Sequence, residues 1–542
     1  MRLEGARALG GSYLSAAEVT AGWFRGPPGF REGRERIIRT GGEMSVGLAS
    51  LRQVIERWSR DQVLALAPDA PSQKAAQGIA APGKWSLRGT TGTVLYGECK
   101  GSGARPYLAC VDLTEPAYRC SCPSRKFPCK HALGLLLMWS ADGVPVQEAA
   151  PQWVTEWLES RAERAAKSAA KIEAARAKAA AQADSGVEGG EGGAAGSGDS
   201  EGAAGSDTAG GAAPGSGGSG SSGTGAGAGG AASGRAREAG AGGESVRHAR
   251  VAAGLAELER WLADQVRQGL AGAAPHEWDG LAKRLIDAQA PGAAGVVSRL
   301  SQVRSEDDWP GRLLEEYALV NLLAVAYRRR AALPGPLAET VLIRAGFPVT
   351  REEVLAGPAV RDRWDVLGRR DEEQDRLTAR RVWLRGRGTG RPALVLSFAP
   401  QGQPLDASLV TGVTIDADLT FYPGAAPLRA LVAARHGTAV PVAEGGAAVS
   451  AVPPGMSPEE ALDEVARALG EDPWTESWPV VLAGVVPARA SIGGLPLHPR
   501  ARDPWRLIAV SGGHPLTVAA EWTPRGLRPL TTWDDEGTAV IL

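Results

Sequence analysis

Cysteine is scarce in this sequence, which has only five cysteines among 542 residues. Three of them fall within one short motif, so too few remain for the disulfide framework of a small secreted protein. The sequence also lacks a strong net charge, because 60 Lys and Arg residues are balanced by 61 Asp and Glu residues. Composition therefore gives no overall signal for a nucleic acid or a membrane surface as partner.

Long apolar runs are absent as well. The longest candidate, residues 317–327, is interrupted by Asn321 and followed by three arginines, which favours a buried helix over a membrane span. Residues 1–43 carry mixed charges and a Gly-Pro-Pro-Gly stretch but no apolar segment typical of a signal peptide. We therefore expect a cytoplasmic protein with a poorly ordered extension at 1–43. Translation from Met44 is a hypothesis that intact-mass measurement tests.

The most informative group of residues lies at 120–131, where three cysteines and one of the six histidines occur together. Cys120 and Cys122 can point to the same face of an extended strand, which Pro123 should end. Positions 129 and 131 would lie about 200° apart on one helix. We therefore expect Cys129 just before the first turn of a buried helix at 132–139, with His131 inside that turn. Thiolate and imidazole are zinc ligands, although four unrelated buried residues are the alternative.

The arrangement Cys-x-Cys followed by Cys-x-His at the start of an apolar helix resembles the SWIM-type zinc finger, over residues 94–139. The resemblance implies a strand-strand-helix unit with Cys120, Cys122, Cys129 and His131 as ligands of one Zn²⁺ ion. It also implies DNA binding and protein–protein interaction. Four protein ligands leave no open position, which favours a structural zinc over a catalytic one. Loss of one ligand, as in Cys129→Ser, is expected to unfold the finger without the C-terminal half.

Basic residues surround the predicted finger. Residues 44–140 contain twelve Lys or Arg residues and six Asp or Glu residues. Phe127 is a candidate for stacking on a base, and basic side chains can neutralise phosphates. The alternatives are a protein partner, or a solvated face that supports the zinc thiolates. The candidate nucleic-acid contacts next to the ligands are Arg119, Arg125, Lys126 and Lys130.

The rest of the chain predicts an α+β protein of several parts. A finger domain at 44–158 should begin with an amphipathic helix at 46–66, in which 62–66 is either a second turn or a separate short helix, and continue with strands at 85–89, 92–97 and 107–111. A solvated Ala-rich helix at 159–184 precedes a disordered linker at 185–244 that is mostly Gly, Ala and Ser. This linker predicts a finger that is tethered to the C-terminal half without packing on it.

The C-terminal half predicts a helical domain at 245–380 and an α+β domain at 381–542. Apolar residues recur at helical spacing through 251–270, 281–288, 294–303, 313–327 and 338–344. Two alternating segments, 381–386 and 393–398, are typical of a β-hairpin. Further expected elements are a helix at 458–469 and strands at 480–486, 505–511, 516–522 and 538–542.

The sequence contains short matches to catalytic motifs, but none has the neighbouring residues or secondary structure that its motif requires. The Gly-x-Ser-x-Gly match at 198–202 lies in the predicted linker, and the His-Glu pair at 276–277 lacks a second His because position 280 is Gly. The Gly-rich segment 386–390 predicts a hairpin turn rather than a phosphate cradle. The acidic run 371–375 predicts a solvated helix face. His436, His498 and His514 have no ligand-like neighbours in sequence.

These observations favour a non-enzymatic, zinc-stabilised adaptor that binds DNA or a protein partner, and they identify no small-molecule substrate. An alternative is an unrecognised enzymatic activity in the C-terminal half that the finger targets to its substrate. A third hypothesis follows from the resemblance alone. Long bacterial SWIM proteins can be encoded near MoxR-type AAA ATPases and von Willebrand A-type proteins, which implies a subunit of a chaperone-like assembly.

Overall fold

The structure is a computed structural model that describes residues 57–184, 229–437 and 452–542, apart from 102, 104, 273, 306, 307, 375, 376, 402, 404, 502 and 503. The extension predicted at 1–43, the start considered at Met44 and the first part of the helix predicted at 46–66 lie outside these residues, as does 185–228 of the linker. All described residues belong to one compact unit, Arg52–Leu542. None of the helices described is long and apolar enough to cross a membrane.

The N-terminal part is a four-stranded antiparallel sheet with short helices. The short helix considered at 62–66 is separate: it begins after Ser59, whose hydroxyl and backbone complete a capping box with Gln62. The three predicted strands are present, and the sheet order is β1-β2-β3-β4. The elements are α1 (Arg60–Ala65), α2 (Ala70–Ile79), η1 (Pro82–Lys84), β1 (Trp85–Thr90), β2 (Val94–Cys99), β3 (Tyr107–Asp112), β4 (Ala117–Cys120) and α3 (Lys130–Ser140).

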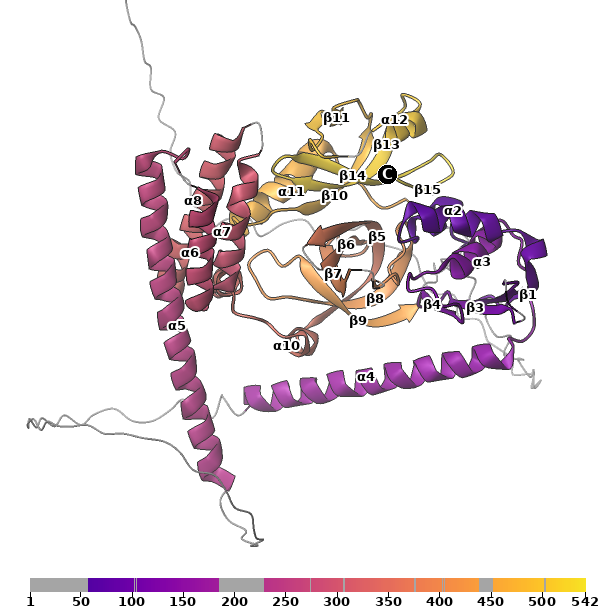
Figure 1. Cartoon of the computed structure of the whole chain (residues 1–542), viewed down its shortest axis with the longest axis horizontal. Coiled ribbons are helices and arrows are strands. Elements are labelled where there is room, and N and C mark those ends of the chain that lie inside the picture. The colour runs from indigo at the N-terminus through magenta and orange to yellow at the C-terminus, as the bar shows by residue number, and fades with distance from the viewer. Residues whose placement is uncertain are drawn as a thin grey trace, which may run out of the picture. The chain divides into compact units, whose positions relative to one another are not determined.

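Helices make up the middle of the chain. The solvated helix is α4 (Gln152–Asp184), and α5 (Gly229–Gln268) begins inside the stretch predicted as linker. Ala, Arg and Glu residues in that stretch favour a helix despite its glycines. In Figure 1, α5, α6, α7 and α8 run side by side around a core in which the Trp278 indole donates to the Tyr317 hydroxyl at 3.0 Å. The remaining elements are α6 (Pro275–Asp287), α7 (Pro291–Val303), α8 (Trp309–Arg328), η2 (Arg330–Ala332), α9 (Gly335–Ala345) and α10 (Arg351–Ala356).

A closed five-stranded barrel follows, with the order β5-β6-β7-β9-β8. The prediction of helix up to residue 380 is wrong, because a long strand starts at Ala359 and contains residues 371–374 of the acidic run that was predicted as a helix face. Asp371 lies opposite Arg380 on the next strand and accepts two hydrogen bonds from its guanidinium, at 2.7 and 2.8 Å. The strands are β5 (Ala359–Gln374), β6 (Leu377–Gly386), β7 (Pro392–Pro400), β8 (Thr414–Phe421) and β9 (Arg429–Gly437).

The hairpin predicted at 381–398 is confirmed as β6 and β7, which pair antiparallel. Its Gly-rich turn is held by Asp362 on β5, whose carboxylate accepts from the backbone N–H groups of Gly388 at 2.9 Å and Thr389 at 2.8 Å. These bonds occupy the turn's donors with a carboxylate of the same chain. The segment is therefore a structural turn, as expected.

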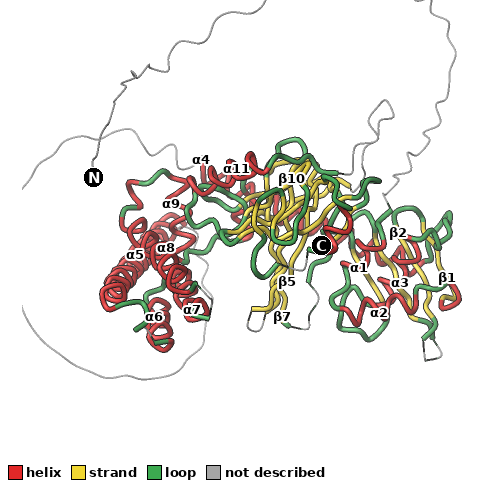
Figure 2. The backbone as a smooth tube through the Cα atoms, turned by 90° about the horizontal axis from the view of Figure 1, so that it is seen from above, coloured by secondary structure: helices red, strands yellow, loops and turns green. Residues whose placement is uncertain are grey.

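The C-terminal part is a sheet of order β10-β13-β14-β15 with two helices, and Figure 2 shows its strands together with those of the barrel. The strand predicted at 505–511 is wrong, because this segment is a helix that buries Leu507 and Ser511, one turn apart, and exposes Trp505. The elements are α11 (Pro458–Glu471), β10 (Trp478–Val485), β11 (Ser491–Ile492), β12 (Leu495–Pro496), α12 (Trp505–Ser511), β13 (Leu516–Thr523), β14 (Gly526–Trp533) and β15 (Ala539–Ile541).

The N-terminal part packs on the barrel, so the expectation of a tethered, unpacked module is wrong for the described residues. One apolar cluster contains Val63 and Leu66 together with barrel residues such as Trp364. The Gln62 amide donates to the Thr411 carbonyl at 3.0 Å, and the Tyr118 hydroxyl donates to the Ala407 carbonyl at 3.3 Å. A long linker permits separation of the two parts but does not prevent them from burying apolar surface together.

Gly412 lies where this packing is tightest. Its φ is +80°, and a Cβ atom there would come within 2.4 Å of the Ala539 Cβ and 2.8 Å of the Gln62 amide nitrogen. We expect Gly412→Ala to lower the free energy of unfolding by about 1–3 kcal/mol, as measured by urea denaturation of the full chain. The control is Gly470→Ala, at an exposed helical glycine with no atom near its Cβ position, which should be neutral or slightly stabilising. Equal effects of the two substitutions would contradict the close contact.

Candidate metal centre and the adjoining groove

Four side chains converge between the end of β4 and the start of α3. Cys120 is the last residue of β4, and Cys122 follows two positions later, just past the strand. Cys129 caps the N-terminus of α3 in an extended conformation, with φ −74° and ψ 165°, and His131 lies in the first turn. One ligand atom from each of the four residues lies within 4.8 Å of the others. The junction between loop and helix is therefore the one that the spacing predicts.

The pKa values of the thiols in this cluster are shifted in opposite directions. The Cys120 thiol donates to the Cys129 sulfur, which lowers the pKa of Cys129 to about 4 and raises the pKa of Cys120. Burial raises the pKa of Cys122. The Cys120 sulfur also lies 3.6 Å from Nδ1 of His131. Three cysteine sulfurs and one imidazole are the donor set of a tetrahedral zinc site, which binds cysteine as thiolate.

Neighbouring side chains hold the ligands in place. The Tyr107 ring packs against the His131 imidazole, with 4.8 Å between ring centroids. Asp69, which caps α2, forms an ion pair with Lys126 in the loop between Cys122 and Cys129. Hydrogen bonds from Lys126 and from Ser72 lower the pKa of Asp69 to about 2. The loop is thus connected to α2 as well as to the sheet.

The structure divides the predicted nucleic-acid residues between two sides of the metal centre. Arg119 is exposed on β4 and lines a groove on one side, whereas Lys126 and Lys130 line a smaller pocket on the other. Arg125 is exposed between them and lines neither. Within the described residues, no carboxylate forms an ion pair with Arg119, Arg125 or Lys130, whereas Lys126 is paired with Asp69.

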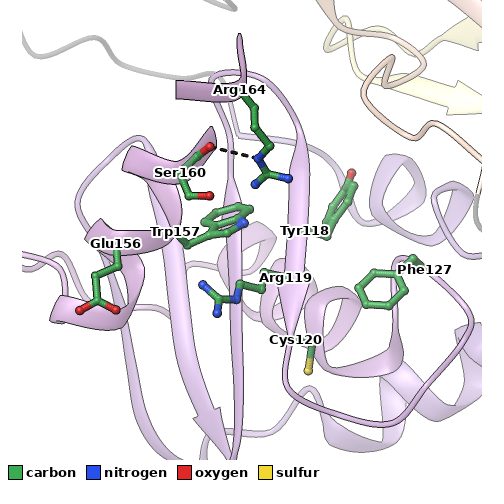
Figure 3. A pocket seen from close by; sticks show the side chains of 8 residues that line it. All are labelled: Tyr118, Arg119, Cys120, Phe127, Glu156, Trp157, Ser160 and Arg164. Atoms are coloured by element: carbon green, nitrogen blue, oxygen red, sulfur yellow. Dashed lines mark hydrogen bonds between the residues drawn. The ribbon is translucent and has the colours of Figure 1, made fainter. Parts of the chain in front are cut away.

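The groove has a volume of about 720 Å³ and one zinc ligand, Cys120, in its wall. Figure 3 shows Phe127 of the zinc loop on one side and Glu156 of α4 on the other, with Arg119 and Arg164 between them. The wall formed by α4 was missed from the sequence. Its signal is the spacing of Trp157, Ser160 and Arg164, which share one helical face. The complete lining is Tyr118, Arg119, Cys120, Phe127, Glu156, Trp157, Ser160 and Arg164.

Comparison with protein families assigns this part of the chain, since residues 110–140 match the model of the SWIM zinc finger. The chain carries a SWIM zinc finger. Residues 246–345 match a second model, the SWIM-associated four-helix bundle domain, which corresponds to the segment from α5 to α9. No curated protein and no solved structure matches the chain.

The family match and the geometry of the four side chains indicate the same cofactor. Cys120, Cys122, Cys129 and His131 are positioned to bind a single zinc ion. Four protein donors complete a tetrahedral shell, so the ion would stabilise the loop and orient α3 without an open position for a substrate.

Proposed function

We propose that this protein binds single-stranded nucleic acid in the groove between the zinc loop and α4, with the zinc ion in a structural role and no catalytic step. The observation that carries the proposal is that Arg119 and Arg164, neither in an ion pair among the described residues, lie in one groove with the half-buried Phe127. Guanidinium groups can neutralise phosphates, and an exposed ring can stack on an unpaired base.

The arrangement favours a single strand over a duplex. A base inside a duplex is already stacked on its neighbours, so Phe127 gains a partner only where bases are unpaired. Trp157 is only 8% exposed, so it forms the floor of the groove and does not offer a ring face on which a base can stack. Glu156 repels phosphate at its side of the groove, which leaves the strand's backbone to the side of Arg119 and Arg164.

The experiment measures binding of a labelled oligo(dT), with and without its complement, to the zinc-loaded full-length protein across a salt series. We expect Arg119→Gln and Arg164→Gln each to reduce the slope of log K against log salt by about 1. Phe127→Leu should weaken single-strand binding by about 1–3 kcal/mol and leave the salt slope unchanged.

The control variant is Arg467→Gln, at an exposed arginine on α11 that lines none of the pockets described above. Zinc content is measured for every variant, because Phe127 and Arg119 lie next to zinc ligands. No binding by protein with one zinc per chain would refute the proposal. The groove would then be a site for a protein partner, and capture of an AAA ATPase by cross-linking would favour the chaperone-like assembly.

A further inference from the structure

A second large pocket, about 470 Å³ in volume, shares no residue with the groove or the zinc ligands. It lies where the turn between β3 and β4, the first part of α4, and α10 meet strands β7 and β9 of the barrel. Leu409 and Leu431, which are 5% and 8% exposed, form part of an apolar wall. The pocket is large enough for a small molecule, and charged and polar side chains line it together with this apolar wall.

Arg435 on β9 is the main polar group of this pocket. Its guanidinium donates to the Ser408 carbonyl at 3.1 Å and to the Ser408 hydroxyl at 2.7 Å. No carboxylate among the described residues forms an ion pair with it. Burial lowers the pKa of Arg435, and the nearby carboxylates of Asp406 and Glu115, which are not in contact with it, offset this only in part. An anion in the pocket would restore the missing partner.

Two further arginines line this pocket, and they differ in whether a carboxylate is already in contact with them. Arg161 is already paired with Glu115, at 3.1 Å, and with Asp112, at 3.6 Å. Asp406 accepts from the Ser408 backbone N–H at 2.8 Å and acts on Arg435 through space without forming an ion pair with it. Arg351, at the start of α10, is exposed and forms no ion pair within the described residues. Two arginines, Arg351 and Arg435, are therefore available to one ligand.

We propose that this pocket binds a small molecule with one carboxylate or phosphate group on an apolar body. The anionic group lies against Arg435 and Arg351, and the apolar part lies along Leu409 and Leu431. A carboxylate and a phosphate both match the paired N–H groups of a guanidinium. The pocket's residues differ from those of the nucleic-acid groove, so this proposal stands independently of the proposed function.

Isothermal titration of the full-length protein tests this site, with octanoate and octyl phosphate as probes and octanol as the uncharged control. We expect saturable binding of at least one anionic probe, and the tighter of the two identifies the preferred head group. Arg435→Gln, which keeps an amide donor near Ser408, and Arg351→Gln should each weaken that probe about tenfold. Arg467→Gln should leave it unchanged.

Arg351 is exposed, so the Arg351→Gln protein is expected to fold normally and to provide a readout even if Arg435→Gln does not. Absence of saturable binding by both anionic probes would overturn the proposal. Binding of octanol as tight as that of the anions would do so too, as would full affinity in the Arg351→Gln protein.

Discussion

Cys129→Ser is expected to abolish stoichiometric zinc binding and to unfold the SWIM finger. Cys129 is a ligand at the N-cap position of α3, and residues 131–139 of that helix are buried. Structural zinc contributes about 10–16 kcal/mol in small fingers, so loss of one ligand removes most of the stabilisation of this loop. Zinc content by mass spectrometry and amide exchange across β1–β4 and α3 measure the effect.

The C-terminal half should also lose stability in this variant, although less than the finger. This differs from the outcome expected from the sequence, because the finger side of the molecule shares an apolar cluster with the barrel. The control is Cys110→Ala, at a fully buried cysteine on β3 that is not a ligand and should retain one zinc per chain. One tightly bound zinc in the Cys129→Ser protein would rule out the four-residue ligand set.

Glu521→Gln is the second substitution with a large expected effect. The Glu521 side chain is 2% exposed, and its carboxylate is in ion pairs with Arg370, Arg381 at 3.8 Å and Arg528 at 3.6 Å. These arginines come from β5, β6 and β14, so one carboxylate connects the barrel to the C-terminal sheet. Removing its charge leaves Arg381 and Arg528 without a carboxylate partner among the described residues and Arg370 with Glu372 alone, at 3.0 Å, which should cost about 3–5 kcal/mol.

Urea unfolding of the full chain measures this loss. Glu339→Gln, at an exposed residue of α9 with no ion pair in the described structure, is the matched control and should change stability by less than about 0.5 kcal/mol. If Glu521→Gln changed the free energy of unfolding by as little as the control does, the arginines would have found other partners. The carboxylate would then not be what joins the two β parts.

The zinc ligands could be predicted from the sequence because they are local. Twelve consecutive residues contain all four, and each spacing permits only one kind of backbone junction. The groove could not be predicted in the same way. Its second wall comes from α4. Residues 157, 160 and 164 line the groove because of how α4 packs beside β4 in the folded protein. The positions of Arg119 and Lys130 on opposite sides of the metal centre also depend on this packing.

The fold was predictable where apolar periodicity was regular, as in the bundle from α5 to α9. Strand β5 was missed because its charged side chains hide the alternation. Arg380 is 5% exposed, and its pairing with Asp371 on the neighbouring strand and its hydrogen bond to the Asp406 carbonyl, at 2.7 Å, compensate for that burial. Helix α12 was mistaken for a strand because a short apolar run is compatible with either structure.

The packing of Val63 and Leu66 against the barrel couples zinc binding by the finger to the stability of the C-terminal half. If folding of the barrel favours the folded finger, zinc must bind more tightly to the full chain than to a finger cut free from the barrel. The barrel must then be more resistant to denaturant with zinc than without it, by the same free energy. Cellular zinc supply would therefore set the stability of residues far from any ligand.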